Sequence, residues 1–302
     1  MAIIPPFLQA GSCIGVLCPA GFMPLDKAQT CLDVLQQWGY RVKAGETLGK
    51  QFNYFSGTDD ERLQDLQQML DDPEVDAILC ARGGYGLSRI IDRIDFSRFV
   101  ERPKWLIGFS DITVLHAHVY RRFGIASLHA PMAAAFNNNE SENQYVQSLR
   151  SSLAGIKEDY QGNSHPLNRV GSAKGELVGG NLSLLAHLIG TPSEIKTKGR
   201  ILFLEDVGEY IYNVDRMFYQ LKRSGKLDKL AALIIGGFTD MKDTTVPFGM
   251  RVYDLISHVV KEYDYPVVFG FPVSHSRENY ALKIGATYKL KVSKEKIRLK
   301  QK

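Results

Sequence analysis

A serine and a glycine-rich turn follow two apolar runs, and their residue types suit nucleophilic chemistry. The run over residues 105–109 ends at Ser110, which opens an amphipathic segment. The run over residues 75–81 ends in the turn at 82–86, Arg-Gly-Gly-Tyr-Gly. If both runs are parallel strands, their carboxyl ends meet at one sheet edge. A serine hydroxyl beside backbone N–H donors is the combination that acyl transfer requires.

Ser110 also has a structural interpretation, because serine is a favoured helix N-cap. Apolar residues at helical spacing follow it, and this pattern ends at Gly124. The surrounding sequence, Gly-Phe-Ser-Asp-Ile, lacks the second glycine of the G-x-S-x-G turn of α/β-hydrolases. The local pattern therefore leaves capping and catalysis both open.

A serine nucleophile needs a base, and the base needs an acid that fixes its tautomer. Among seven histidines, His275 stands out because it lies in a loop after the apolar run 267–271. A plain surface role is its alternative. Glu205 follows another apolar run, where a buried strand is predicted to emerge. Asp206 and Glu209 compete with it, and all three acids have surface or helix-start alternatives.

Length and periodicity predict an α/β fold with two domains. A chain of 302 residues exceeds what one core usually supports. Within residues 1–136, short apolar runs alternate with helical patterns, which predicts an N-terminal domain with a mostly parallel, Rossmann-like sheet. Residues 137–171 are rich in Asn, Ser, Gln and Gly, and we expect them to link the domains. Residues 172–302 are predicted to form a smaller, mixed α/β C-terminal domain.

Composition argues against several classes of protein. Hydrophobic residues make up 44% of the chain and charged residues 23%, as in ordinary globular proteins. The net charge is +4, and the basic residues near the C-terminus alternate with apolar ones, so we expect no nucleic-acid partner. No apolar run approaches the ~20 residues that span a bilayer, so we expect no membrane association. The four cysteines lack metal-type spacing and no basic leader is present, which indicates reduced thiols and a cytoplasmic protein.

Six ordered motifs resemble the LD-carboxypeptidases of serine peptidase family S66, a group that includes the microcin-immunity hydrolases. The motifs span nearly the whole chain and lie at residues 15–21, 81–86, 107–113, 179–182, 204–209 with 215–217, and 270–275. The resemblance implies a catalytic triad of Ser110, Glu205 and His275, with the serine on the first domain and the other two on the second. It also implies an oxyanion hole formed by the backbone amides of Gly84 and Asp111.

The resemblance further implies a substrate. Members of this family typically act in cell-wall recycling, where they cleave the bond between the L-centre of meso-diaminopimelate and the terminal D-alanine of murein tetrapeptides. Arg82 lies beside the implied site and is a candidate for binding the terminal carboxylate, with an internal salt bridge as its alternative. Two departures from the family pattern leave loop shape and substrate contacts open: Ser274 replaces a frequent glycine, and Lys283 replaces a proline.

The implied mechanism needs no metal and no cofactor, because the triad supplies its own base. No H-E-x-x-H pair and no Cys/His cluster with ligand spacing occurs in the sequence. Two alternatives stay open: a hydrolase of aminoacyl-nucleotide amides, like the microcin-immunity branch, and a two-domain binding protein without catalysis. The glycine turn lacks the third glycine of G-x-G-x-x-G, which disfavours nucleotide binding. The oligomeric state is also open, with a homodimer as one candidate.

Overall fold

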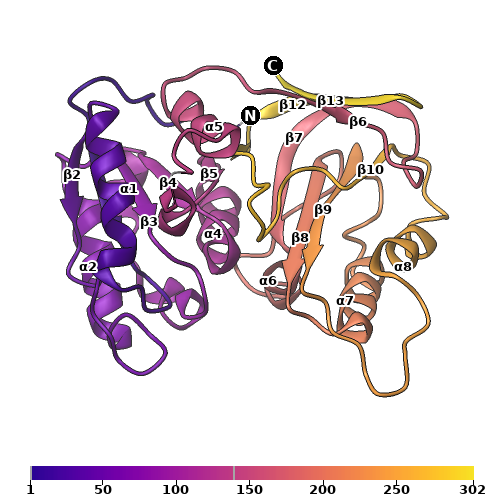
Figure 1. The fold of residues 1–302 in the computed structure, drawn as a ribbon, viewed down its shortest axis with the longest axis horizontal. Helices are drawn as coiled ribbons and strands as arrows, with labels where there is room; N and C mark the ends of the chain where they lie inside the picture. The colour runs from indigo at the N-terminus through magenta and orange to yellow at the C-terminus, as the bar shows by residue number, and fades with distance from the viewer. Residues whose placement is uncertain (1, 139) are drawn as a thin grey trace.

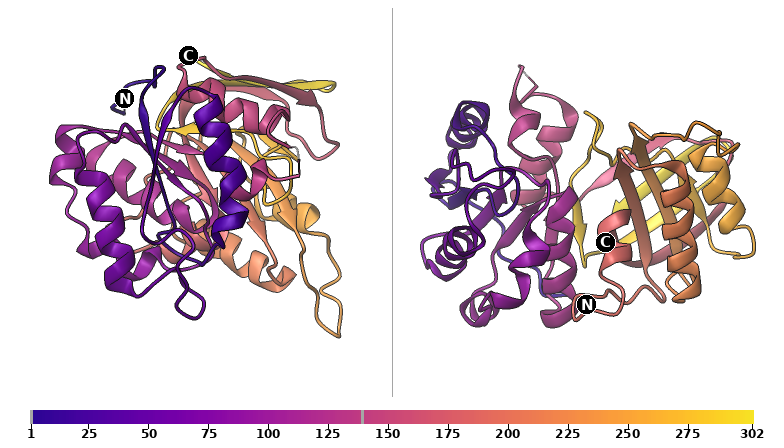
Figure 2. Two further views of the ribbon diagram at one scale, coloured as in Figure 1. Left: turned by 60° about the vertical axis from the view of Figure 1, so that its left-hand side comes forward. Right: turned by 90° about the horizontal axis from the view of Figure 1, so that it is seen from below.

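The fold is built on two β-sheets that lie side by side (Figures 1 and 2). The computed structural model describes residues 2–138 and 140–302. The first sheet has the strand order β11-β5-β4-β3-β1-β2, and its neighbours pair in parallel except β11, which is antiparallel to β5. Its strands are β1 (Cys13–Leu17), β2 (Arg41–Ala44), β3 (Ala77–Cys80), β4 (Trp105–Gly108), β5 (Ser127–His129) and β11 (Leu282–Ile284). The mostly parallel sheet confirms the predicted α/β class.

Helices connect the strands of the first sheet, and local sequence signals explain where two of them begin or end. The Thr58 hydroxyl accepts from the Glu61 amide and the Glu61 carboxylate accepts from the Thr58 amide, so a capping box starts α2. Gly124 ends α4 in the left-handed conformation, with φ of 64°. The helices of this half are α1 (Leu25–Gln37), α2 (Asp59–Asp71), α3 (Ser97–Glu101), α4 (Thr113–Phe123) and α5 (Gln144–Leu153).

The second sheet is mixed and has the strand order β10-β9-β8-β7-β12-β13-β6. Neighbours from β7 to β10 pair in parallel, whereas β12, β13 and β6 are added in antiparallel pairs. Its strands are β6 (Asp159–Asn163), β7 (Gly171–Asn181), β8 (Ile201–Val207), β9 (Ala232–Thr239), β10 (Val267–Phe269), β12 (Thr287–Val292) and β13 (Lys296–Gln301). The accompanying helices are α6 (Leu182–His187), α7 (Ile211–Arg223) and α8 (Val252–Val259).

The chain passes between the two sheets more than once. Residues 137–171, predicted as a connection, contain α5 and also β6, which forms an edge of the second sheet beside β13. Conversely, β11 comes from the C-terminal part of the sequence and joins the first sheet beside β5. A buried ion pair, with Lys283 Nζ 2.6 Å from Glu158 Oε1, ties β11 to the segment that enters β6. The two sheets are therefore joined by more than one linker.

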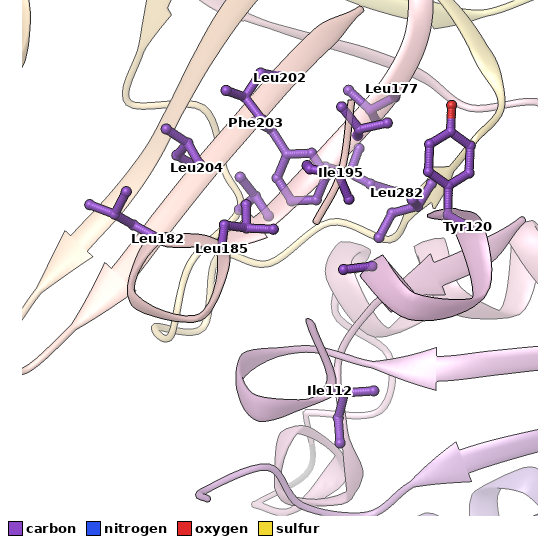
Figure 3. Close-up of a cluster of buried hydrophobic side chains, with 14 of the residues drawn as sticks. Ile112, Tyr120, Leu177, Leu182, Leu185, Ile195, Leu202, Phe203, Leu204 and Leu282 are labelled. Carbon is purple, nitrogen blue, oxygen red and sulfur yellow. The ribbon is translucent and has the colours of Figure 1, made fainter. Parts of the chain in front are cut away.

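One hydrophobic core continues from the first sheet into the second (Figure 3). Its members from both sides include Ile112, Tyr120, Leu177, Leu182, Phe203 and Leu282. At the start of α4 the contact is polar, because the Thr113 hydroxyl accepts from the Asn181 amide at 3.1 Å. Gly180 permits this approach, since a Cβ there would lie 2.6 Å from Thr113 Oγ1. The beginning of α4 and the end of β7 are thus fixed relative to each other.

The helices bear on the expected lack of membrane association, and the cysteines bear on the expectation of reduced thiols. Across residues 2–138 and 140–302, no helix is both long and apolar enough to cross a membrane. All four cysteines are free and buried. Burial raises the pKa of the Cys18 thiol to about 12, so this side chain stays protonated at neutral pH.

Candidate active site

Ser110 lies at a strained turn between β4 and α4. Its φ of 63° falls in the left-handed region, which costs a non-glycine residue roughly 1–2 kcal/mol. Such strain concentrates at functional sites, where it aims a side chain against the local preference of the backbone. Within the described chain, the Ser110 side chain caps neither η3 (Ser110–Ile112) nor α4. The capping interpretation of this serine therefore finds no support.

The glycine turn after β3 packs directly on this serine. A Cβ added to Gly83 would lie 2.9 Å from Ser110 Cβ and 3.2 Å from the Asp111 amide nitrogen, so a side chain does not fit there. Gly84 follows with φ of 92°, a conformation that favours glycine. The two turns that the sequence places after neighbouring strands are in contact in the folded chain.

The side chain of Asp111 ties these two turns together. It is fully buried, and its Oδ2 accepts from the Leu87 amide at 2.9 Å. Burial raises the pKa of this carboxyl to about 6, although the Leu87 hydrogen bond and the Arg62 guanidinium act in the opposite direction. Its Oδ1 has no hydrogen-bond partner among the residues described. The carboxyl group therefore holds the glycine turn against the serine turn from the inside.

Glu205 and His275 form a buried, hydrogen-bonded pair. Glu205 lies on β8 and is fully buried, and its Oε2 is 2.6 Å from His275 Nδ1. Burial raises the pKa of Glu205, and the hydrogen bond with His275 acts to lower it. When Nδ1 donates to the carboxylate, a neutral ring carries its lone pair on Nε2. That nitrogen is buried and has no hydrogen-bond partner in the described part of the chain, so it can accept a proton from a substrate or nucleophile.

The two competing acids have other partners. Asp206 accepts from the amide and the hydroxyl of Ser183, at 3.0 and 2.7 Å, and so holds the start of α6. Glu209 accepts from the same hydroxyl at 3.1 Å. Of the three acids that the sequence offers, Glu205 is the one whose carboxylate contacts His275.

Phe109 connects the two halves of the site. Its ring lies edge-on to the His275 imidazole, with ring centroids 4.8 Å apart, and it directly precedes Ser110. The loop that carries His275 lies close against β9, because a Cβ on Gly237 would collide with the Ser274 side chain. The Ser274 hydroxyl donates to a backbone carbonyl four residues later at 2.9 Å and closes this loop. Sequence reasoning missed Phe109, although its position beside the serine was a usable signal.

A cavity of about 450 Å³ opens beside these groups. Phe109, His275 and three charged side chains, Arg82, Glu140 and Arg277, are among the residues that line it. Arg82 is exposed, and its guanidinium forms no ion pair with any described residue, so the salt-bridge alternative finds no support. No group of three or more His, Cys, Asp or Glu side chains within the described residues is placed to hold a metal ion.

Lys283 and the Thr113–Asn181 pair have structural roles that the sequence motifs do not show. Lys283 takes no part in the loop of His275, because it is buried in β11 and paired with Glu158. Thr113 and Asn181 form the hydrogen bond that docks α4, and with it the serine turn, on β7. Sequence reasoning did not assign this positioning role, since nothing local shows that the two residues meet.

The chain is similar to known carboxypeptidases over nearly its whole length. The family described as the LD-carboxypeptidase N-terminal domain matches residues 14–130, and the LD-carboxypeptidase C-terminal domain matches residues 174–290. The probable murein peptide carboxypeptidase of Bacillus subtilis is 37% identical, covering 93% of this chain and 89% of that protein. The murein tetrapeptide carboxypeptidase of Pseudomonas aeruginosa is 31% identical, covering 91% of each.

Solved structures show the same likeness. The crystal structure of muramoyltetrapeptide carboxypeptidase from Oxalobacter formigenes superimposes with a TM-score of 0.86 at 29% identity, covering 96% of this chain and 98% of that one. The microcin C7 self-immunity protein MccF superimposes with a TM-score of 0.88 at 22% identity, covering 99% of each chain, which shows a shared fold.

Proposed function

This chain belongs to the LD-carboxypeptidase family S66, whose members are serine hydrolases, and we propose that it removes the terminal D-alanine from murein tetrapeptides. The bond cleaved would join the L-centre of meso-diaminopimelate to D-alanine. One observation carries the proposal: in the buried Glu205–His275 pair, Nε2 has no partner among the described residues, and Phe109 links this ring to the strained turn of Ser110. The relatives named as murein peptide carboxypeptidases support the substrate class.

The proposed reaction begins with attack of Ser110 Oγ on the scissile carbonyl carbon, while His275 Nε2 takes the hydroxyl proton. Glu205 keeps the other ring nitrogen protonated and stabilises the imidazolium. The carbonyl oxygen gains negative charge, which the backbone amides of Gly84 and Asp111 would stabilise. Collapse of the tetrahedral intermediate breaks the C–N bond, and the imidazolium donates its proton to the amine of the departing D-alanine.

Water completes the cycle through the same groups. His275 removes a proton from water as its oxygen attacks the acyl ester on Ser110, and then returns a proton to Ser110 Oγ. In this scheme the imidazole supplies the base and the amides supply the electrostatic stabilisation, so no metal and no cofactor takes part. EDTA should therefore leave turnover unchanged, and a loss of activity that zinc restores would contradict the scheme.

Arg82 is proposed to bind the free carboxylate of the terminal D-alanine. It lines the cavity, and its guanidinium has two parallel N–H donors for a bidentate contact. A carboxypeptidase needs such a group, because it must distinguish the chain end from an internal peptide bond. Recycling returns wall fragments to the cell interior, so the proposal also places the enzyme in the cytoplasm.

The decisive experiment compares D-alanine release from murein tetrapeptide and pentapeptide by mass spectrometry. The terminal bond of the tetrapeptide is L,D, whereas that of the pentapeptide is D,D. Inverting the acyl centre displaces either its side chain or the terminal carboxylate, so we expect about 100-fold or greater preference for the tetrapeptide. Faster release from the pentapeptide would overturn the assignment.

A serine-directed fluorophosphonate probe tests the class of protein. An enzyme of this mechanism should take up one label at Ser110 and none after Ser110→Ala. A protein that only binds its ligand would remain unlabelled in both forms. Hydrolysis of an aminoacyl-nucleotide amide, with murein tetrapeptide left intact, would instead favour an activity of the microcin-immunity type.

A further inference from the structure

Glu140 and Arg277 form an ion pair at the cavity. Arg277 Nε and Nη2 donate to Glu140 Oε2 at 2.9 and 2.6 Å. Glu140 precedes α5, whereas Arg277 lies two residues after His275, so the pair joins two sides of the cavity that are far apart in sequence. The two side chains are 65% and 34% exposed, respectively for arginine and glutamate. Because an exposed ion pair contributes little to folding stability, stability is a weak explanation for it.

Both partners keep hydrogen-bonding capacity for a ligand. The two bonds from Arg277 and a third from Asn143 Nδ2, at 3.2 Å, all fall on the same carboxylate oxygen of Glu140. Within residues 2–138 and 140–302, no hydrogen bond involves Arg277 Nη1 or Glu140 Oε1. A guanidinium has five N–H donors, so the pair offers free donors and a free acceptor side by side. A ligand group that carries a carboxylate and an ammonium together fits both.

Hydrogen bonds flank the two side chains on either side of the cavity. On one side, the Glu140 amide donates to the Asn137 carbonyl at 3.2 Å, and the Asn143 amide donates to the Glu140 carbonyl at 3.0 Å. On the other side, the Ser274 hydroxyl closes the loop that carries Arg277. Backbone hydrogen bonds therefore support Glu140, and the closed loop supports Arg277.

The charges of the cavity match those on the two sides of the scissile bond. Arg82 is a single cation, and terminal D-alanine carries a single carboxylate. The diaminopimelate side chain ends in a zwitterion, because its D-centre bears both an ammonium and a carboxylate. We infer that Arg277 binds the carboxylate of this zwitterion and that Glu140 binds its ammonium. The inference rests on the proposed function, and it names Arg277 and Glu140 as the residues that recognise the third amino acid of the substrate.

The reach of the substrate agrees with this assignment. Arg277 is two positions after His275 in the chain, which corresponds to at most about 7 Å between their Cα atoms. Three methylene groups separate the two α-carbons of diaminopimelate, a span of roughly 5–6 Å at C–C bonds of about 1.5 Å. An acyl carbon placed for attack near the His275 ring therefore puts the zwitterion within reach of the Arg277 side chain.

The consequence is selection at the third residue of the peptide, which three tetrapeptides test. L-lysine in this position keeps the ammonium but lacks the carboxylate, and diaminopimelate amidated at its D-centre keeps the shape but lacks the negative charge. Either would deprive the Arg277 guanidinium of the ligand carboxylate, although its ion pair with Glu140 would remain. We expect kcat/KM for D-alanine release to be about 10–100-fold higher with diaminopimelate than with either analogue.

Variants of the pair separate binding from loop support. Arg277→Gln should lower kcat/KM for the diaminopimelate peptide by about 10–30-fold, through KM, and should leave the two analogues within about 2-fold. Glu140→Gln should weaken all three peptides by about 3–10-fold, because all three keep the ammonium. Arg298→Gln is the matched control, since Arg298 also donates from Nε and Nη2 to a carboxylate, that of Asp159 on the second sheet, with one bond to each oxygen. It should change none of these values.

Two outcomes would overturn the inference. One is no discrimination by the wild-type enzyme, and the other is an equal loss on all three peptides with Arg277→Gln, which would mean that the pair only supports the His275 loop. Failure of the proposed function has a different signature, because the wild type would then release D-alanine from none of the peptides. Binding to the Ser110→Ala variant still decides in that case: the inference requires about 10-fold or tighter binding of the diaminopimelate peptide, and equal affinities refute it.

Discussion

Two buried glutamates each pair with a basic side chain at the same distance, yet their surroundings differ. Glu205 Oε2 lies 2.6 Å from His275 Nδ1, and Glu158 Oε1 lies 2.6 Å from Lys283 Nζ. At Glu158 the second oxygen is also taken, because it accepts from the Tyr288 hydroxyl. At the other pair, Glu205 Oε1 and His275 Nε2 have no hydrogen-bond partner in the described chain.

The difference distinguishes a structural pair from one that can react. A buried polar atom without a partner costs roughly 1–3 kcal/mol, so a folded protein retains one chiefly where the atom is needed. Desolvation does not make the distinction, since burial raises the pKa of Glu205 and also lowers the pKa of Lys283. Among the described residues, His116 Nδ1 and His129 Nδ1 also lack a partner, but the other nitrogen of each ring contacts the Gly108 carbonyl or the Asn279 amide oxygen. His275 therefore stands out because its unpartnered nitrogen is combined with a carboxylate on the opposite nitrogen.

Removing that nitrogen should give the largest effect. His275→Ala, like Ser110→Ala, should lower kcat for D-alanine release by about 10⁴-fold or more, because the members of a triad act as a unit. Circular dichroism and thermal unfolding should show that both variants still fold. Near wild-type turnover in either purified variant would remove that residue from the mechanism.

The charge of Glu205 should matter almost as much. Glu205→Gln keeps the side-chain shape, but its amide can donate to Nδ1 and stabilise the wrong ring tautomer, so kcat should fall by roughly 10³–10⁴-fold. Glu209→Gln is the matched control, because Glu209 hydrogen-bonds Ser183 and not His275. We expect it to stay within about 5-fold of wild type. A larger effect of Glu209→Gln than of Glu205→Gln would show that the acid is wrongly assigned.

Local patterns locate the site residues in the sequence but not their contacts. Ser110, Glu205 and His275 each follow an apolar run, and strand ends are where functional side chains collect, so their positions are accessible to sequence reasoning. The choice among the three acids cannot be made from the sequence, because it depends on which carboxylate reaches a histidine about seventy residues away. The ion pair of Glu140 with Arg277 cannot be predicted from the sequence for the same reason, since its partners are 137 residues apart.

The fold shows the same division between local and long-range information. The strict alternation of apolar runs and helical patterns is enough to predict the parallel first sheet. Strand β11 has only three residues, so it is too short to show the alternating hydrophobic pattern of a strand. Its place beside β5 is decided by tertiary packing. Helix α5 lies between polar stretches whose composition resembles a linker, although its buried residues Tyr145, Val146, Leu149 and Leu153 keep a helical spacing.

In the Lys283–Glu158 pair, both carboxylate oxygens have partners. Substitutions in this pair should therefore change stability and not turnover. Lys283→Met leaves the Glu158 carboxylate buried without its cation, which typically costs about 3–5 kcal/mol of unfolding free energy. Combining it with Glu158→Gln should recover much of this loss, because the unpaired charge is removed as well. Urea unfolding measures both effects. In the folded variant kcat should stay within about 3-fold of wild type, and a drop of tenfold or more would place this pair in the active site.

A third buried carboxyl, that of Asp111, should give the smallest effect when it is replaced conservatively, and Asp111→Asn should show this effect through the pH dependence of stability. Burial raises its pKa from 3.8 to about 6, so the folded chain holds a proton that the unfolded chain releases. This contribution to stability is complete below about pH 4 and is lost as the pH rises through about 6, a change of roughly 2–3 kcal/mol. Asp111→Asn removes the titration, while its side-chain oxygen can still accept from the Leu87 amide.

Urea unfolding of wild type and Asp111→Asn between pH 4 and pH 7 tests this expectation. The free energy of unfolding of the wild type should fall relative to the variant across that range, and parallel curves would contradict the raised pKa.

Turnover of Asp111→Asn should stay within about 3-fold of wild type, because the backbone amide proposed for the oxyanion hole is unchanged. Asp111→Ala removes the acceptor for Leu87 and frees the glycine turn, so it should lower kcat clearly more than Asp111→Asn does. Equal turnover of the two variants would show that the buried carboxyl group does not position the proposed oxyanion hole.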